Sequence, residues 1–406
     1  MKAMGPLPRS YDADADGRLM IGGRNAEALV GDAGGTPLFV YDTRGIADRV
    51  ARFRAAFPSD VALHYAVKAN PYVPLLEIMA NLVDGFDVAS AGELGRVAHL
   101  GLPISFAGPG KRDPEFETAI RAGITINLES EGEAERALAI CEREGLTAKL
   151  AIRVNPPFGL KGSGQKMGGL PSQFGIDHDR APALVRRVIE AGADWRGLHI
   201  FAGSQALHAD ALVELQREIV ALAASICEEA GHAPAHVNLG GGFGIPYFAK
   251  DEPLDTEAVG TALANTLADR PKILTDTQFA IELGRWLVGE AGAYLARIVD
   301  RKESRGKTFL VTDGGLHHQL AASGNFGQLL RRNYAIAIAS RFAAAPEEEV
   351  TITGCLCTPL DLLADEVMLP RAEVGDLVAI FCAGAYGLTA SPTAFLSQPM
   401  AREMLV

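Results

Sequence analysis

Between residues 60 and 285 the chain repeats one pattern, in which a short apolar run rich in Val, Ile, Leu and Phe precedes a longer stretch with helical spacing. Buried parallel strands joined by helices form either an open doubly wound sheet or a closed barrel. Eight such repeats favour the closed (β/α)8 TIM barrel, with the doubly wound sheet as the alternative. The predicted strands are residues 61–67, 85–89, 104–108, 124–128, 148–154, 195–201, 235–240 and 277–283.

The pattern changes after residue 285. Strand-like runs separated by turns replace the alternation of strands and helices. Apart from the stretch around 327–343, no helical pattern stands between these runs, which predicts an antiparallel β domain. Because the first 35 residues also read as turn-rich or extended, we expect a barrel domain at 36–285 and a β domain made of 1–35 and 286–406. The strand-like runs of this C-terminal part are 289–303, 307–315, 348–356 and 375–384.

Charge and cysteine content argue against several classes of protein. The formal net charge of -12 makes nucleic acid or an anionic membrane surface an unsuitable partner. The apolar runs are too short to cross a bilayer, and the N-terminus lacks a signal-peptide core. Five scattered cysteines in 406 residues predict a cytoplasmic protein without a disulfide scaffold. Cys355 and Cys357 look like half of a metal site, but no second Cys or His pair stands at ligand spacing, so we expect no metal.

Polar residues and glycines stand at the carboxyl ends of the predicted barrel strands, where barrel enzymes place their reactive groups. Each of them alone is best explained as a satisfied polar residue at a strand terminus, and Lys68 alone as a solvated lysine. At equivalent positions in one barrel they would instead converge on a single mouth. These residues are Lys68, Asp87, Arg153, His199, Gly240, Gly241, Gly242, Glu282 and Arg285.

Three consecutive glycines in the segment NLGGGFG (238–244) follow the seventh predicted strand. Glycines leave backbone N–H groups open to an anion, and barrels often bind phosphate after strands seven and eight. A phosphate cradle, a lysine, a histidine and a buried carboxylate together predict pyridoxal 5'-phosphate as the cofactor. A flexible turn is the alternative explanation for the glycines.

Ten short motifs resemble, in order and over nearly the whole chain, those of the fold-type III pyridoxal phosphate-dependent decarboxylases, the group of the diaminopimelate and ornithine decarboxylases. The resemblance implies a carboxy-lyase that works as a homodimer with composite active sites. The motifs are TPLFVYD, YAVKANP, FDVASAGEL, RVNP, FGID, HIFAGSQ, NLGGGFG, ELGR, GCLCTPLD and GAYG.

The resemblance also implies roles for single residues. Lys68 would carry the cofactor as a Schiff base, His199 would stack on its ring, and Glu282 would face its pyridine nitrogen. Racemases of this fold have an arginine in place of the glutamate, so Glu282 indicates decarboxylation. Cys357 would enter the partner subunit's site and protonate Cα, with a buried structural cysteine as the alternative. The remaining cofactor contacts would be Asp87, Ser204, Gly240, Gly241, Gly242, Gly284, Arg285 and Tyr386, and the substrate contacts Arg153, Arg285 and Asp361.

Several positions depart from the pattern of diaminopimelate decarboxylase. That family has Glu-Ser after the catalytic cysteine, where the glutamate grips the far amino group of the substrate, but this chain has Thr358 and Pro359. Gln173 replaces a usual lysine. A site built around a polar group discriminates strongly by that group, so its loss argues against diaminopimelate.

At these positions the chain resembles the branch that includes the exosortase-associated decarboxylases. The segments KMGGLPSQFGID and GCLCTPLD carry this resemblance. Some members of this branch act on amino acids held on a carrier protein. We therefore expect a free or carrier-protein-bound amino acid or derivative as substrate, in polysaccharide or secondary-metabolite biosynthesis. The glycine-rich stretch 158–171 is either a lid for a bulky substrate or a plain surface loop. Diaminopimelate decarboxylase in lysine biosynthesis and a non-catalytic regulatory binding protein of the same fold are the alternative functions.

Overall fold

The computed structural model describes residues 2–160, 165–166, 168–328 and 330–406. Its internal contacts divide the chain into two compact units. No helix among the described residues is both long enough and apolar enough to span a membrane. Unit 1 comprises Met1–Arg49, Ile245–Glu252 and Arg285–Val406, and unit 2 comprises Val50–Gly244 and Pro253–Gly284.

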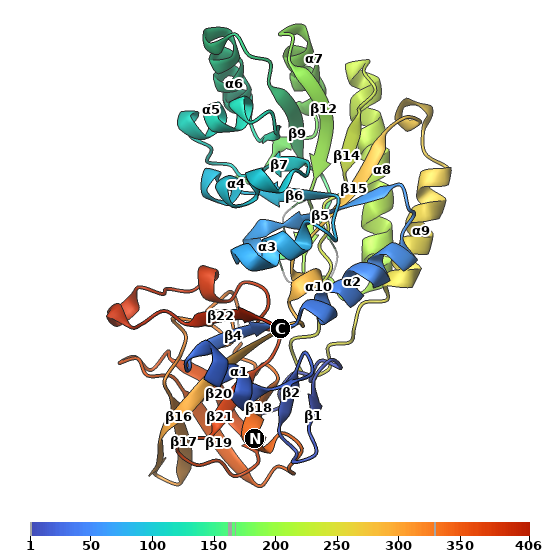
Figure 1. Ribbon diagram of the computed structural model, residues 1–406. Coiled ribbons are helices and arrows are strands. Elements are labelled where there is room, and N and C mark those ends of the chain that lie inside the picture. The colour runs from blue at the N-terminus through green and yellow to red at the C-terminus, as the bar shows by residue number, and fades with distance from the viewer. Residues whose placement is uncertain (1, 161–164, 167, 329) are drawn as a thin grey trace. The chain divides into compact units, whose positions relative to one another are not determined.

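Unit 2 contains a closed barrel of eight parallel strands (Figure 1). Each strand pairs with the next one along the chain, and the last strand pairs with the first to close the ring. This closure excludes the doubly wound sheet and confirms the predicted barrel. The strands are β5 (Val61–Ala66), β6 (Gly85–Val88), β7 (Ile104–Phe106), β8 (Thr125–Leu128), β9 (Lys149–Asn155), β12 (Asp194–Ile200), β14 (His236–Asn238) and β15 (Gln278–Leu283).

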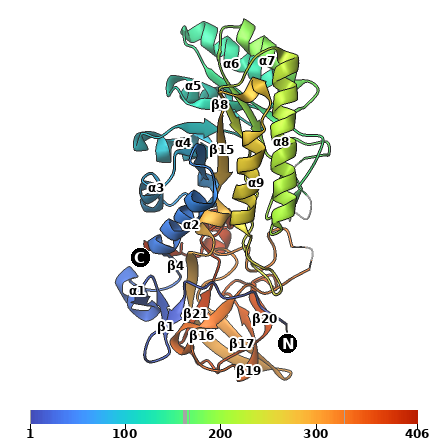
Figure 2. The same ribbon diagram turned by 90° about the vertical axis from the view of Figure 1, so that its right-hand side faces the viewer.

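Helices connect the barrel strands and cover the outside of the ring. Ser90 and Ser130 start two of them by accepting the amide hydrogens of Glu93 and Glu133, which satisfies N–H groups that a helix start leaves unpaired. The two helices α8 and α9 lie side by side in both views (Figures 1 and 2). α2 (Thr43–Ala56) precedes β5, and the helices between the strands are α3 (Val73–Met79), α4 (Ala91–Val97), α5 (Asp113–Arg121), α6 (Glu131–Glu144), α7 (Ala181–Glu190), α8 (Ala209–Ala230) and α9 (Thr256–Ala268).

Unit 1 contains an eight-stranded sheet. Most neighbouring strands are antiparallel as predicted, but β17 with β19 and β22 with β4 are parallel, so the sheet is mixed. Both parallel pairings join strands that are not neighbours in the chain, so the local sequence pattern does not reveal them. The strands are β4 (Leu38–Tyr41), β16 (Gly292–Ser304), β17 (Lys307–Thr312), β18 (Ile336–Ile338), β19 (Glu348–Thr353), β20 (Leu362–Leu369), β21 (Leu377–Ile380) and β22 (Arg402–Leu405).

The N-terminal segment differs in two ways from the sequence prediction. The sequence predicts that residues 36–49 belong to the barrel domain. They belong to unit 1 instead, because β4 pairs with β16 and β22. All four residues of β4 are buried, so its apolar run looks the same as that of a barrel strand. The first 35 residues also contain a helix besides their short strands. These elements are β1 (Asp12–Ala13), β2 (Leu19–Ile21), β3 (Arg24–Asn25) and α1 (Ala26–Ala33).

Candidate active site

Three of the predicted site residues meet at the carboxyl ends of the barrel strands. Lys68 lies in the single turn η1 (Val67–Ala69) directly after β5, and its Nζ lies 3.8 Å from Glu282 Oε1. Glu282 Oε2 lies 3.1 Å from His199 Nε2, and the side chains of both residues are 3% exposed. The Lys68 side chain is 44% exposed. The mouth of the barrel therefore presents an accessible amine beside a buried carboxylate and imidazole.

Glu282 and Asp87 are two buried carboxyl groups whose pKa values shift in opposite directions. Burial favours the neutral form of Glu282, but the close contact with His199 and the positive charges of Lys68 and Arg153 outweigh burial and hold its pKa below the ordinary value. The pKa of Asp87 is raised well above its ordinary value by burial and by the negative charge of Glu282. Glu282 therefore carries the negative charge of the pair at neutral pH.

Arg153, a predicted substrate contact, has a fixed partner inside the barrel. Its Nη1 donates a hydrogen bond to Glu129 Oε1 over 2.9 Å, and the two side chains are 9% and 2% exposed. The other oxygen of Glu129 accepts the amide hydrogen of Gly175, and the guanidinium lies 5.0 Å from the centroid of the Phe174 ring. Glu129 was not predicted, although it directly follows β8, as the predicted site residues follow or end other barrel strands.

The glycine segment after β14 is built for close backbone approach. Gly240 and Gly242 have φ angles of 67° and 82°, which favour glycine, and a Cβ on Gly241 would lie 1.9 Å from the carbonyl oxygen of Glu282. Gly240 N donates to Asn238 Oδ1 over 2.8 Å, so Asn238 fixes the start of the turn. The amides of Gly241 and Gly242 donate no hydrogen bond to any residue that the structure describes. These two amides are therefore suited to an anion.

Ser204 and Gly284 also lie in unit 2. Ser204 belongs to β13 (Gly203–Ser204), which pairs with β10 (Gln165–Lys166). A Cβ on Gly284 would lie 2.7 Å from the Cβ of Ala69, so glycine at this position lets the chain after β15 pass close to the turn that carries Lys68. The stretch 158–171, predicted as a lid or a loop, includes residues 161–164 and 167, which lie outside the described residues.

Two other predicted cofactor contacts form a cluster within unit 1. Arg285 is the first residue of α10 (Arg285–Val288), and its Nη1 donates to the Tyr247 hydroxyl over 3.0 Å. The same guanidinium lies 4.6 Å from the centroid of the Tyr386 ring. Tyr386 has a φ of 53°, an uncommon value for a residue with a side chain. The roles of Arg285 and Tyr386 toward the cofactor remain predictions, and Tyr247 was not predicted.

The turn after β19 carries Cys357, whose side chain is exposed. Asp361 organises this turn, because its Oδ1 accepts the amide hydrogen of Leu316 over 2.7 Å and its Oδ2 accepts that of Leu356 over 2.8 Å. Asp361 is 3% exposed. Its carboxylate thus binds backbone amides of unit 1, a structural role that differs from the predicted substrate contact.

Among the residues that the structure describes, no three His, Cys, Asp or Glu side chains are grouped to hold a metal.

The residues at the barrel mouth fit the pyridoxal phosphate that the sequence predicts. The buried His199 Nδ1 and Asp87 Oδ1 have no hydrogen-bond partner among the described residues, so polar groups are left over in this mouth. Gly241 and Gly242 offer amides to a phosphate, and a Cβ at either position would clash with backbone. Lys68 supplies a primary amine next to the buried carboxylate of Glu282. The donor set therefore matches an aldehyde with a phosphate and a ring nitrogen.

Comparison with known proteins agrees with this geometry. Residues 43–289 match the family model described as pyridoxal-dependent decarboxylase, pyridoxal binding domain. L-glutamyl-[BtrI acyl-carrier protein] decarboxylase of Niallia circulans is 36% identical over 379 residues, which cover 91% of this chain and 88% of that protein. Diaminopimelate decarboxylase of Methanothermobacter thermautotrophicus is 31% identical over 404 residues, covering 96% and 91%. The crystal structure of diaminopimelate decarboxylase from M. jannaschii with L-lysine superposes with a TM-score of 0.87 at 27% identity, covering 98% of this chain and 93% of that one.

Proposed function

Because the chain belongs to the pyridoxal-dependent decarboxylase family, we propose that it removes CO2 from an amino acid or amino-acid derivative attached to a carrier protein. The enzyme is a carboxy-lyase that uses pyridoxal phosphate. The bound cofactor supplies an acceptor for the electron pair that departing CO2 leaves on Cα. The observation that carries the proposal is the buried carboxylate of Glu282, which lies 3.8 Å from Lys68 Nζ and 3.1 Å from His199 Nε2.

Each residue at the barrel mouth has a definite task in this proposal. Lys68 would hold the cofactor aldehyde through its amine. Glu282 would keep a proton on the pyridine nitrogen, because its own pKa is held below the ordinary value. His199 would lie against the cofactor ring, and its Nε2 lies 3.1 Å from Glu282 Oε2. The amides of Gly241 and Gly242 would bind the phosphate.

Cys357 is the proposed acid that returns a proton to Cα after CO2 has left. Its exposure on the turn after β19 suits a thiol that enters the site of a second subunit. We therefore propose a homodimer in which each site combines the lysine of one subunit with the cysteine of the other. The chain's five cysteines are all free thiols, in keeping with a proposed location in the reducing cytoplasm.

The substrate is proposed from the side chains around Cys357. Diaminopimelate carries a second ammonium group at its far end. A protein recognises such a group with a carboxylate that is not already bound to other protein groups. Thr358 and Pro359 follow Cys357, and the nearby Asp361 carboxylate is buried and bound to backbone amides. The similarity to an enzyme named for a glutamyl group on an acyl-carrier protein favours a carrier-bound acyl amino acid. L-Glutamyl carrier protein is the first substrate to test.

The test measures CO2 release by the purified holoenzyme from L-glutamyl carrier protein, from carrier proteins loaded with other amino acids, and from free L-glutamate and meso-diaminopimelate. Unloaded carrier protein serves as the control. We expect release from at least one loaded carrier, and no lysine from meso-diaminopimelate. Lysine formation with a kcat/KM above that of every loaded carrier would replace this proposal with diaminopimelate decarboxylase.

A further inference from the structure

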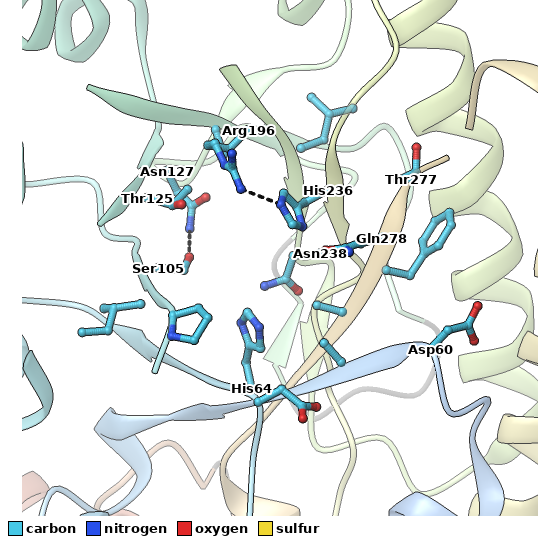
Figure 3. Close-up of a pocket in the computed structure, with 18 of the residues that line it drawn as sticks. Asp60, His64, Ser105, Thr125, Asn127, Arg196, His236, Asn238, Thr277 and Gln278 are labelled. Atoms are coloured by element: carbon cyan, nitrogen blue, oxygen red, sulfur yellow. Dashed lines mark hydrogen bonds between the residues drawn. The ribbon is translucent and has the colours of Figure 1, made fainter. Parts of the chain in front are cut away.

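The opposite mouth of the barrel, at the amino ends of the strands, contains a cavity of about 570 Å³ (Figure 3). Its volume lies within the range of about 300–1,000 Å³ that is usual for small-molecule sites. Barrel interiors are normally filled by branched side chains, but here Ala62, Ser105, Ala151 and Ala280 line the space. The cavity exists because the strands place small residues in this layer. All of its lining residues belong to unit 2.

An arginine and a histidine form one side of this cavity. Arg196 Nη2 lies 2.8 Å from His236 Nε2, and the two side chains meet at the upper edge of the cavity (Figure 3). A guanidinium only donates hydrogen bonds, so Nε2 of His236 is the acceptor and its Nδ1 carries the proton. Burial and the charge of Arg196 lower the pKa of His236, in agreement with a neutral ring. Arg196 Nε is buried and has no hydrogen-bond partner among the described residues.

Two further side chains also offer donors to the cavity. The Oδ1 of Asn238 accepts the amide hydrogen of Gly240, which leaves the Asn238 amide NH2 as the group facing the cavity between His236 and His64 (Figure 3). Ser105 Oγ accepts a hydrogen bond from Asn127 Nδ2 over 2.7 Å, so the Ser105 hydroxyl hydrogen remains available. The cavity is therefore rich in donors whose orientation is fixed by their other hydrogen bonds.

The acidic residues that line the cavity leave its hydrogen-bond donors available to an anion. Asp84 is bound by Arg54 at 2.8 Å and by the amide of Leu63 at 2.7 Å, and Asp60 is exposed at the rim. Asp194, which does not line the cavity, lies 3.5 Å from Arg196 Nη1, the nitrogen that does not contact His236. Among the described lining residues, Arg196 is the only arginine or lysine.

From this arrangement we propose that the cavity at the amino-terminal mouth binds a small organic anion through a carboxylate, at a site separate from the catalytic mouth. Arg196 supplies the charge, and His236, Asn238 and Ser105 supply neutral donors, a combination that gives strong charge-assisted hydrogen bonds to a carboxylate. Asn238 lines this site and holds Gly240, the first glycine of the segment that is proposed to bind phosphate. A bound anion would thus contact a residue that also shapes the catalytic mouth.

The test is isothermal titration calorimetry of the cofactor-loaded protein with succinate, with the neutral isostere succinamide and with inorganic phosphate. We expect succinate to bind, and succinamide and phosphate to bind more weakly. Arg196→Gln is expected to weaken succinate binding by about tenfold or more, because it removes a charged donor. Arg217→Gln removes the same charge from the exposed face of α8 and serves as the matched control. Ala62→Leu, which fills the cavity and keeps Arg196, is also expected to abolish binding.

Each alternative outcome would overturn the proposal. The absence of succinate binding to the wild-type protein would mean that the cavity holds water. Equal succinate affinity in wild type, Arg196→Gln and Ala62→Leu would place the binding elsewhere, including the catalytic mouth. Tighter binding of phosphate than of succinate would reject the carboxylate.

Discussion

Replacement of Glu282 by glutamine tests the electrostatic core of the catalytic mouth. Glutamine has nearly the same shape and keeps an acceptor for His199, which lies 3.1 Å away, but it removes the negative charge. The side chain is 3% exposed, so water cannot replace that charge. Loss of one preorganised electrostatic contact in a buried site lowers kcat by about 10²–10³, or about 2.7–4 kcal/mol. We expect a decrease of this size in CO2 release per mole of bound cofactor.

Two comparisons make the result interpretable. Glu282→Asp keeps the charge and is expected to retain more activity than Glu282→Gln. Glu133→Gln removes another buried carboxylate, whose Oε2 lies 3.0 Å from Lys111 Nζ with side chains 3% and 1% exposed. That variant is expected to lose stability by about 3–5 kcal/mol but to keep its kcat per bound cofactor. A Glu282→Gln kcat within about twofold of wild type would refute the reasoning.

Three further substitutions test other parts of the proposed site. Lys68→Ala is expected to lose both the visible absorbance of the bound cofactor and CO2 release, and decarboxylation at the wild-type rate would reject the role of Lys68. Cys357→Ala is expected to slow turnover or to increase the fraction of transaminated cofactor, measured by product analysis; unchanged kinetics and products would remove Cys357 from the mechanism. Gly241→Ala is expected to raise the Kd for pyridoxal phosphate in a fluorescence titration, because its Cβ would lie 1.9 Å from the Glu282 carbonyl oxygen. Gly95→Ala, with no atom within 4 Å of the new Cβ, is the control, and equal Kd values would contradict the phosphate role.

The barrel was predictable because its signal is local. Each strand is a short apolar run, each connection has helical spacing, and the reactive residues stand at one end of each run. That rule led to Lys68, His199 and Glu282, which the structure brings together. The same rule applies to Glu129, which directly follows β8 and pairs with Arg153.

Other features depend on contacts between distant segments. Nothing in the run 38–41 tells which sheet it joins, because a strand buried on both faces reads the same in a barrel and in a mixed sheet. The parallel pairing of β17 with β19 is equally invisible in the local pattern. Asn238 and Asp361 act through hydrogen bonds to backbone amides, and the type of residue alone does not distinguish such a task from substrate binding.

The central claim, that Lys68 at the mouth of the barrel holds the cofactor, has a direct test. The holoenzyme is reduced with borohydride, digested and examined by peptide mass spectrometry. We predict that the reduced cofactor is attached to the peptide containing Lys68. Attachment to another lysine, such as the buried Lys111 that is paired with Glu133, would contradict the account. Recovery of every lysine peptide without the cofactor would contradict it as well.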